Sequence, residues 1–427
     1  MIRAFFAALL AAVGIGGPAP APAPVPPAGP GKVPASVLGI LWNETGFAKP
    51  RLAQLKPLTL EPTGRAMPLR LGGGSATAVS PDGRLLAVGT AAPGIQLIDL
   101  RRMKEIGYVK LGGTGWVTNL FWEHGTLFAA VQSDTNGAVL VIDPVGRQVI
   151  QRHRLQRAIL VVGHGIGSIV LVTAPRNAIG PVELTVVGGK GMSSVPIPNV
   201  LGGSEAENGA DGFRARQVTP GLAIDRAGRR AFILPAGRTV AEISLRNLAL
   251  DYHELSEPVS LLGRLHNWLE PSAEAKLIEG PQRKATWLGE GLIALTGADY
   301  TTVNDSNGQP EVHVQAAGLS FIDTSDWSLR EINEETSDLT VSGPTLLAFG
   351  DTSWGDPAAK GLGLVGYDHH GGELFQVLKS RRVGWLETAG DLAYVVVDDK
   401  RRVVVDAASG RVLARAVLSQ PLSVLPD

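Results

Sequence analysis

The chain has 427 residues, with 39 lysines and arginines against 40 aspartates and glutamates, and it contains no cysteine. Its length exceeds the roughly 250–300 residues at which a single hydrophobic core stops growing, so several domains or one repetitive architecture are expected. The balanced charge argues against a nucleic-acid binder, and the missing cysteines exclude disulfides, thiolate metal ligands, cysteine nucleophiles and a lipid-bearing cysteine.

The first 17 residues have the pattern of a signal peptide. Arg3 precedes an apolar run from Ala4 to Ile15, which is shorter than the roughly 20 residues that a membrane-spanning helix needs. An uncleaved N-terminal anchor is the alternative interpretation of this run. Residues 18–35 are rich in Pro and Ala and are expected to form an extended, solvated linker. We therefore predict a secreted or cell-wall-associated protein with no transmembrane segment after signal removal.

One stretch, residues 75–111, provides the template for a repeat of four short strands. The strands are expected at 76–79, 85–89, 95–99 and 108–111, and Pro81-Asp82-Gly83 forms the turn between the first two. Glycine in this turn can adopt a positive φ. The third strand ends at Asp99, whose carboxylate can accept a hydrogen bond from the following backbone and so start the next turn.

This strand-ending position recurs along the chain. Five of the seven spacings between successive copies fall between 38 and 45 residues, and the other two, of 57 and 79 residues, indicate insertions. Four strands in a period of about 40–45 residues are typical of a β-propeller blade. The pattern predicts an all-β propeller of eight four-stranded blades, with seven blades as the alternative, from these third-strand ends: Lys56, Asp99, Asp143, Val187, Ser244, Asp323, Asp368 and Asp406.

The first unit lacks a first strand of its own. Residues 37–43, 51–57 and 66–71 are expected to be its second, third and fourth strands, and residues 421–425 are positioned to supply the first. Pairing the two ends of the chain in this way would remove the open sheet edges of a linear array. Residues 36–427 are therefore predicted to form a single propeller domain closed by its N- and C-terminal strands.

Two segments carry a resemblance to a known family. The sequence SPDGRLLAV at 80–88 is followed by IQLIDL, and DRAGRRAFIL at 225–234 is followed by AEISL. They resemble the YVTN and WD40-like propeller repeats of exported bacterial proteins, although the YVTN tetrapeptide itself is absent. The resemblance implies the fold over about residues 36–425, and it implies no particular function, because this scaffold carries both binding modules and enzymes.

The four longest connections, 199–216, 256–283, 299–317 and 350–361, are all expected on one rim of the ring, where they can form a binding site. Several basic residues precede first strands on this rim and are candidates for binding an anion. Tryptophans in or beside the same connections can stack on a sugar ring. The alternatives are that the basic residues are solvated surface charges and that the tryptophans pack between blades. The candidate ligand-binding residues are Arg216, Arg283, Lys284, Trp287, Trp354, Arg382 and Trp385.

No catalytic constellation, metal site or cofactor motif is recognised in the sequence. We therefore expect a monomeric, exported binding module, rather than an enzyme, that recognises a surface glycan, a small anion or a protein partner. The alternative is a metal-dependent lyase or hydrolase acting at the central channel.

Overall fold

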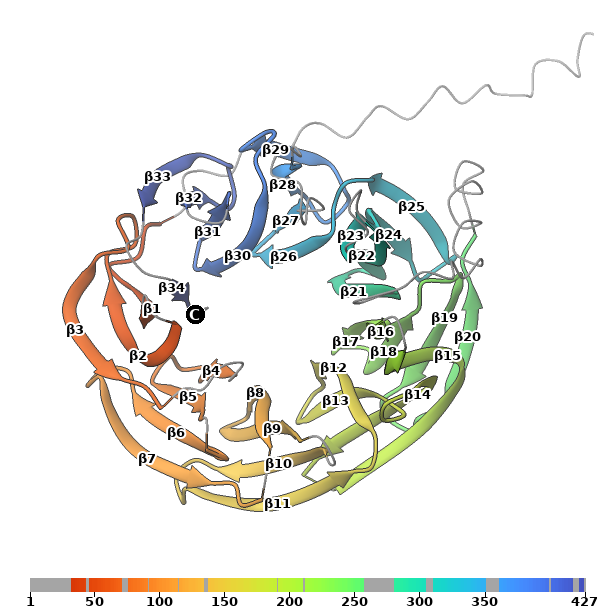
Figure 1. Ribbon diagram of the computed structural model, residues 1–427, viewed down its shortest axis with the longest axis horizontal. Coiled ribbons are helices and arrows are strands. Elements are labelled where there is room, and N and C mark those ends of the chain that lie inside the picture. Colours follow the sequence, from red (N-terminus) through yellow and green to blue (C-terminus); the bar gives the residue numbers. More distant parts are fainter. Residues whose placement is uncertain are drawn as a thin grey trace, which may run out of the picture.

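The computed structural model is a ring of eight β-sheets around a central channel (Figure 1). It describes residues 32–43, 46–70, 76–90, 92–113, 115–133, 137–189, 191–209, 212–256, 280–304, 310–350, 361–398, 401–417 and 422–425, and these form strands and turns without a helix. Six sheets have four strands and two have five. The prediction of eight blades is confirmed, and the seven-blade alternative is wrong. The predicted signal peptide lies outside the described residues, as does most of the linker.

In most blades the first strand lies at the channel and the strands follow chain order outward; in blade 1 the C-terminal β34 takes the innermost place, and in blade 6 β23 pairs with β22 off this path. Blade 1 holds β1 (Val37–Asn43), β2 (Gly46–Leu55) and β3 (Pro62–Pro68) beside the C-terminal β34 (Leu422–Val424). Blade 2 consists of β4 (Thr77–Val79), β5 (Leu85–Gly89), β6 (Gly94–Asp99) and β7 (Lys104–Lys110). Blade 3 consists of β8 (Trp116–Glu123), β9 (Thr126–Gln132), β10 (Gly137–Asp143) and β11 (Gln148–Leu155).

Blades 4 and 6 are the five-stranded sheets, and the four-stranded blade 5 lies between them in the chain. Blade 4 consists of β12 (Ala158–His164), β13 (Ser168–Ala174), β14 (Ile179–Gly188), β15 (Gly191–Gly209) and β16 (Gly212–Val218). Blade 5 consists of β17 (Gly221–Asp225), β18 (Arg230–Leu234), β19 (Thr239–Ser244) and β20 (Leu250–Glu254). Blade 6 consists of β21 (Gly280–Gly289), β22 (Leu292–Asn304), β23 (Pro310–Ala316), β24 (Leu319–Asp323) and β25 (Ser328–Asn333).

The last two blades return to the simple pattern. Blade 7 consists of β26 (Asp338–Ser342), β27 (Thr345–Gly350), β28 (Gly363–Tyr367) and β29 (Glu373–Val377). Blade 8 consists of β30 (Val383–Ala389), β31 (Leu392–Val397), β32 (Arg401–Asp406) and β33 (Val412–Val417).

The recurring aspartates start turns, as the sequence predicted. Asp143 accepts the N–H of Val145 at 2.9 Å, and the equivalent Asp323 accepts the N–H of Ser325 at 2.8 Å. The aspartate that ends β32, Asp406, likewise accepts the N–H of Ser409 at 2.9 Å. Each carboxylate satisfies a backbone donor that would otherwise be unpaired where the third strand ends.

The hydrophobic core lies between neighbouring blades. In β31, Ala393 packs with residues of blade 7, whereas the next residue, Tyr394, packs with Leu422 and Val424 of blade 1. Successive side chains of a strand point to opposite faces, and both faces of a blade are covered. The second and third strands are therefore nearly continuous apolar runs.

The ring is closed by β34, which pairs antiparallel with β1. Two side chains of blade 8 hold this closing strand. The carboxylate of Glu387 accepts the N–H of Val424 at 2.7 Å, and the guanidinium of Arg402 donates to the carbonyl of Leu422. Arg402 also contacts Glu387 at 3.4 Å, and both side chains are 11% exposed. Burial raises the pKa of Glu387 and lowers that of Arg402.

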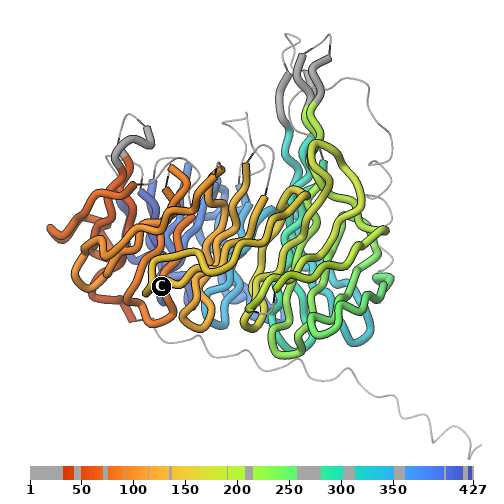
Figure 2. The backbone as a smooth tube through the Cα atoms, turned by 90° about the horizontal axis from the view of Figure 1, so that it is seen from below, coloured from red at the N-terminus to blue at the C-terminus, as the bar shows by residue number. Residues whose placement is uncertain are grey.

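Two hairpins rise together from one face of the ring, namely β15–β16 and β22–β23 (Figure 2). They contain two of the long connections expected on one rim, 199–216 and 299–317. Thr219, just after β16, forms a parallel bridge with Gln282 of β21. The backbones approach so closely that a Cβ on Gly280 would lie 2.5 Å from the carbonyl oxygen of Gln217. Most of 256–283 and nearly all of 350–361 lie outside the described residues.

Candidate functional site

The ring has two unlike rims. We call the one that carries the links between blades and the connections from second to third strands the long-loop rim, and the opposite one the short-turn rim. Both hairpins rise from the long-loop rim. The sequence placed the binding site there.

Three of the four predicted cations on the long-loop rim are paired with carboxylates. Arg216 contacts Glu205 at 2.9 Å. Arg283 contacts Asp299 at 2.7 Å, and its side chain is only 11% exposed. The fourth, Arg382, donates its backbone N–H to Asp398 at 3.4 Å. A carboxylate partner offsets the positive charge of the paired cation and occupies some of its hydrogen-bond donors, so less of both remains for an anionic ligand.

The third pair, between Lys284 and Asp338, lies beside a cavity of about 400 Å³. We call this cavity the aromatic pocket, because Trp385 and Tyr300 line it together with Asp338. Trp385 is 59% exposed. Burial, assisted by the charge of Asp338, raises the pKa of Tyr300, so its hydroxyl keeps its proton. The pocket combines an exposed indole with a hydroxyl and a carboxylate, groups that can stack on and hydrogen-bond to a sugar.

Of the other two predicted tryptophans, Trp287 does not line this pocket. Trp287 stacks on Phe232, with ring centroids 5.5 Å apart and planes inclined by 6°, and Arg230 lies over its ring. This residue therefore belongs to the core between blades, which was the alternative role. Trp354 lies outside the described residues.

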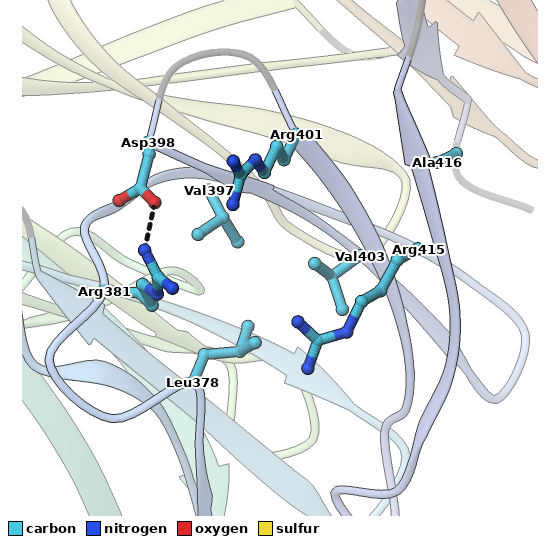
Figure 3. Close-up of a pocket in the computed structure, with 8 residues that line it drawn as sticks. All are labelled: Leu378, Arg381, Val397, Asp398, Arg401, Val403, Arg415 and Ala416. Atoms are coloured by element: carbon cyan, nitrogen blue, oxygen red, sulfur yellow. Dashed lines mark hydrogen bonds and ion pairs between the residues drawn. The ribbon is translucent and has the colours of Figure 1, made fainter.

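A second cavity, of about 300 Å³, opens on the same rim at the seam between blades 7 and 8 (Figure 3). We call it the arginine pocket. Arg381, Arg401 and Arg415 turn toward one opening, and Arg381 contacts Asp398 at 3.1 Å. The walls are apolar and come from Leu378, Val397, Val403 and Ala416. Arg401 and Arg415 are exposed, and neither forms an ion pair with a described residue.

The two pockets lie at different depths of the ring. The aromatic pocket spans blades 6 to 8 and uses β22, β26 and β30, of which β26 and β30 are the innermost strands of their blades. The arginine pocket uses β32 and β33 toward the periphery. Arg401, Arg415 and Tyr300 are not among the binding residues predicted from the sequence. A usable signal was the repeated pair of arginines, 381–382 and 401–402, because both pairs fall at the same rim of one blade.

The described residues contain no helix long and apolar enough to cross a membrane. Within the same ranges, no three His, Asp or Glu side chains are grouped so that they could hold a metal ion.

Comparisons with known proteins identify the fold. No family model matches the chain, and no curated protein matches it. The dihydro-heme d1 dehydrogenase NirN in complex with DHE is similar in structure, with a TM-score of 0.56 and 16% identity over 95% of this chain and 78% of that chain. BamB from Moraxella catarrhalis gives a TM-score of 0.43 at 11% identity, covering 84% of this chain and 88% of its own. The chain is a β-propeller of WD40-like architecture, and at these identities the likeness extends to the fold alone.

Proposed function

We propose that this protein is a binding module whose long-loop rim recognises an acidic glycan. The observation that carries the proposal is the arginine pocket, where Arg381, Arg401 and Arg415 face one opening and Asp398 is the only carboxylate among the described residues that line it. Three guanidinium groups against one carboxylate leave a net positive charge there.

The chemistry of this pocket suits a carboxylate, sulfate or phosphate. A guanidinium group presents paired N–H donors that match the two oxygens of such a group. The apolar walls of Leu378, Val397 and Val403 exclude water from one side of the pocket, which strengthens each charge-assisted hydrogen bond. Asp398 contacts Arg381 and so leaves Arg401 and Arg415 as the main donors for a ligand.

The aromatic pocket favours a carbohydrate over an isolated ion. Trp385 lines this pocket and is 59% exposed, and sugar rings stack on exposed indole faces. A chain of acidic sugars lying along the seam would contact both pockets. We further propose that the protein is exported and that residues 18–35 hold the propeller away from the surface to which it is attached. The alternative, a metal-dependent lyase or hydrolase, has no ligand set among the described residues to support it.

Binding of an oligogalacturonate, measured by isothermal titration calorimetry in low salt, tests the proposal. The double variant R401S/R415S should weaken binding by roughly tenfold or more, because charge-assisted hydrogen bonds contribute about 1.5–3 kcal/mol each. The control is R154S/R411S, which changes net charge equally at two exposed arginines outside the pocket. The fully methyl-esterified oligosaccharide should bind weakly to the wild type. Equal binding of both sugars, or of both double variants, would contradict the proposal.

A further inference from the structure

The short-turn rim also contains a hollow, of about 900 Å³, that the sequence did not predict. It lies where the turns of blades 2 to 5 meet beside the channel. Its lining residues are Ser80, Pro81, Asp82, Leu85, Trp122, Glu123, His124, Gly125, Pro144, Val145, His164 and Arg226. A hollow of this size is in the range of sites that hold small organic molecules.

A buried carboxylate organises the polar end of the hollow. Glu123 is 7% exposed, and both of its oxygens accept from Nη2 of Arg226 at 3.0 Å. Glu123 also accepts the N–H of Gly167 at 3.1 Å, and Nδ1 of His124 lies 3.0 Å from it. These contacts connect blades 3, 4 and 5, so the position of Arg226 is fixed by a group that is itself immobile.

Arg226 therefore presents donors to the hollow in a preset orientation. Its side chain is 51% exposed, and among its contacts with described residues only Nη2 is engaged. The Nε and Nη1 groups are left for a ligand. Two imidazoles line the same hollow. That of His124 is exposed, and that of His164 lies edge-on against Phe121, with ring centroids 4.0 Å apart.

Burial, and then the charge of Arg226, lower the pKa of His164. This imidazole therefore stays neutral at neutral pH and can donate or accept one hydrogen bond at each ring nitrogen.

The rest of the hollow is apolar. Leu85, Trp122 and Pro144 line it, and Val145 is 88% exposed at its edge. The carboxylate of Asp82, which also lines the hollow, accepts from Ser80 at 2.6 Å and lies 3.6 Å from the guanidinium of Arg84. Arg226 is the only lysine or arginine among the described residues that line the hollow. A molecule that fits must therefore combine one anionic head with an apolar body.

We propose that the short-turn rim holds a second binding site, for a small amphipathic monocarboxylate. Arg226 is the residue that binds the carboxylate of this molecule. The carboxylate of the ligand lies against Nε and Nη1 of Arg226, and its hydrocarbon body lies along Leu85, Pro144 and Val145. The buried Glu123 acts as a positioning residue for Arg226. This site is independent of the acidic-glycan site on the opposite rim.

Sodium decanoate, titrated into the full chain below its micelle-forming concentration, tests this site. The variant R226Q should weaken binding by roughly tenfold or more, because it removes a charge-assisted hydrogen bond. The matched control is R229Q, which alters an exposed arginine of the same turn that does not line the hollow. V145E places a negative charge at an exposed position on the wall and should abolish binding without disturbing the fold.

Three outcomes would overturn this proposal. They are no binding of decanoate by the wild-type chain, equal binding of decanoate and decanol, and equal binding by R226Q and R229Q. Oligogalacturonate binding by R226Q and V145E serves as the independent readout. It should match the wild type, so failure of the monocarboxylate site can be distinguished from failure of the glycan site.

Discussion

Replacing Arg402 with methionine tests how blade 8 holds the closing strand. The change removes the hydrogen bond to the carbonyl of Leu422 and the contact with Glu387 at 3.4 Å. Removing one partner of a buried ion pair costs about 3–5 kcal/mol, because the other charge is left without compensation. Burial already raises the pKa of Glu387 with Arg402 present, and losing the cation raises it further. The unpaired carboxyl group of Glu387 can therefore take up a proton. We expect the free energy of unfolding to fall by about 3 kcal/mol at pH 7.5, the low end of that range.

Protonation of Glu387 makes the loss of stability in R402M depend on pH. An acid whose pKa is higher in the folded than in the unfolded chain binds more protons when folded, so its contribution to stability increases as the pH falls through the folded pKa. The difference between the wild type and R402M in the free energy of unfolding should therefore shrink from pH 7.5 to pH 5.5. Urea unfolding followed by circular dichroism measures it at both values. The control is R411M, an exposed arginine of the same blade. A loss below about 1 kcal/mol, or an equal loss at both pH values, would refute the argument.

Further predictions concern the ring closure and the tryptophans. A chain that ends at Val417 lacks β34 and leaves β1 with an unpaired edge; it should aggregate and unfold at lower temperature by differential scanning calorimetry, whereas a chain that ends at Leu425 should match the wild type. W287A should lower the free energy of unfolding by about 2–3 kcal/mol in urea unfolding, because the half-buried indole stacks on the core residue Phe232. W385A should change stability by no more than about 0.5 kcal/mol, because its side chain is 59% exposed, and it should weaken oligogalacturonate binding in the same calorimetric assay.

The fold was predictable because each blade repeats a local signal. Asp99 and Asp143 end third strands 44 residues apart, and both, like Asp323 in blade 6, accept a backbone N–H in the turn that follows. The predicted strands of the first unit also match well, with β1 at Val37–Asn43 as expected. The start of β2 at Gly46 came five residues earlier than predicted, because the hairpin with β1 extends to its tip, where Asn43 pairs with Gly46.

The candidate sites were predictable only in part. The sequence indicated that the long-loop rim and Trp385 belong to a candidate binding site. It could not show that Arg283 forms an ion pair with Asp299, since this pairing depends on the register between β21 and β22. It could not bring Arg401 and Arg415 together either, because they meet only through the pairing of β32 with β33. The contact between Glu123 and Arg226 spans 103 residues and three blades, and no periodic pattern encodes such a separation.

The position at which the described chain begins gives the molecule an orientation. The backbone N–H of Lys32 donates to Asp391, in the turn between β30 and β31, at 3.0 Å, and this turn belongs to the short-turn rim. The described chain therefore begins on that side of the ring. Both hairpins and the arginine pocket lie on the opposite rim. A support coupled to the protein at Lys32 would accordingly leave the proposed glycan surface unobstructed.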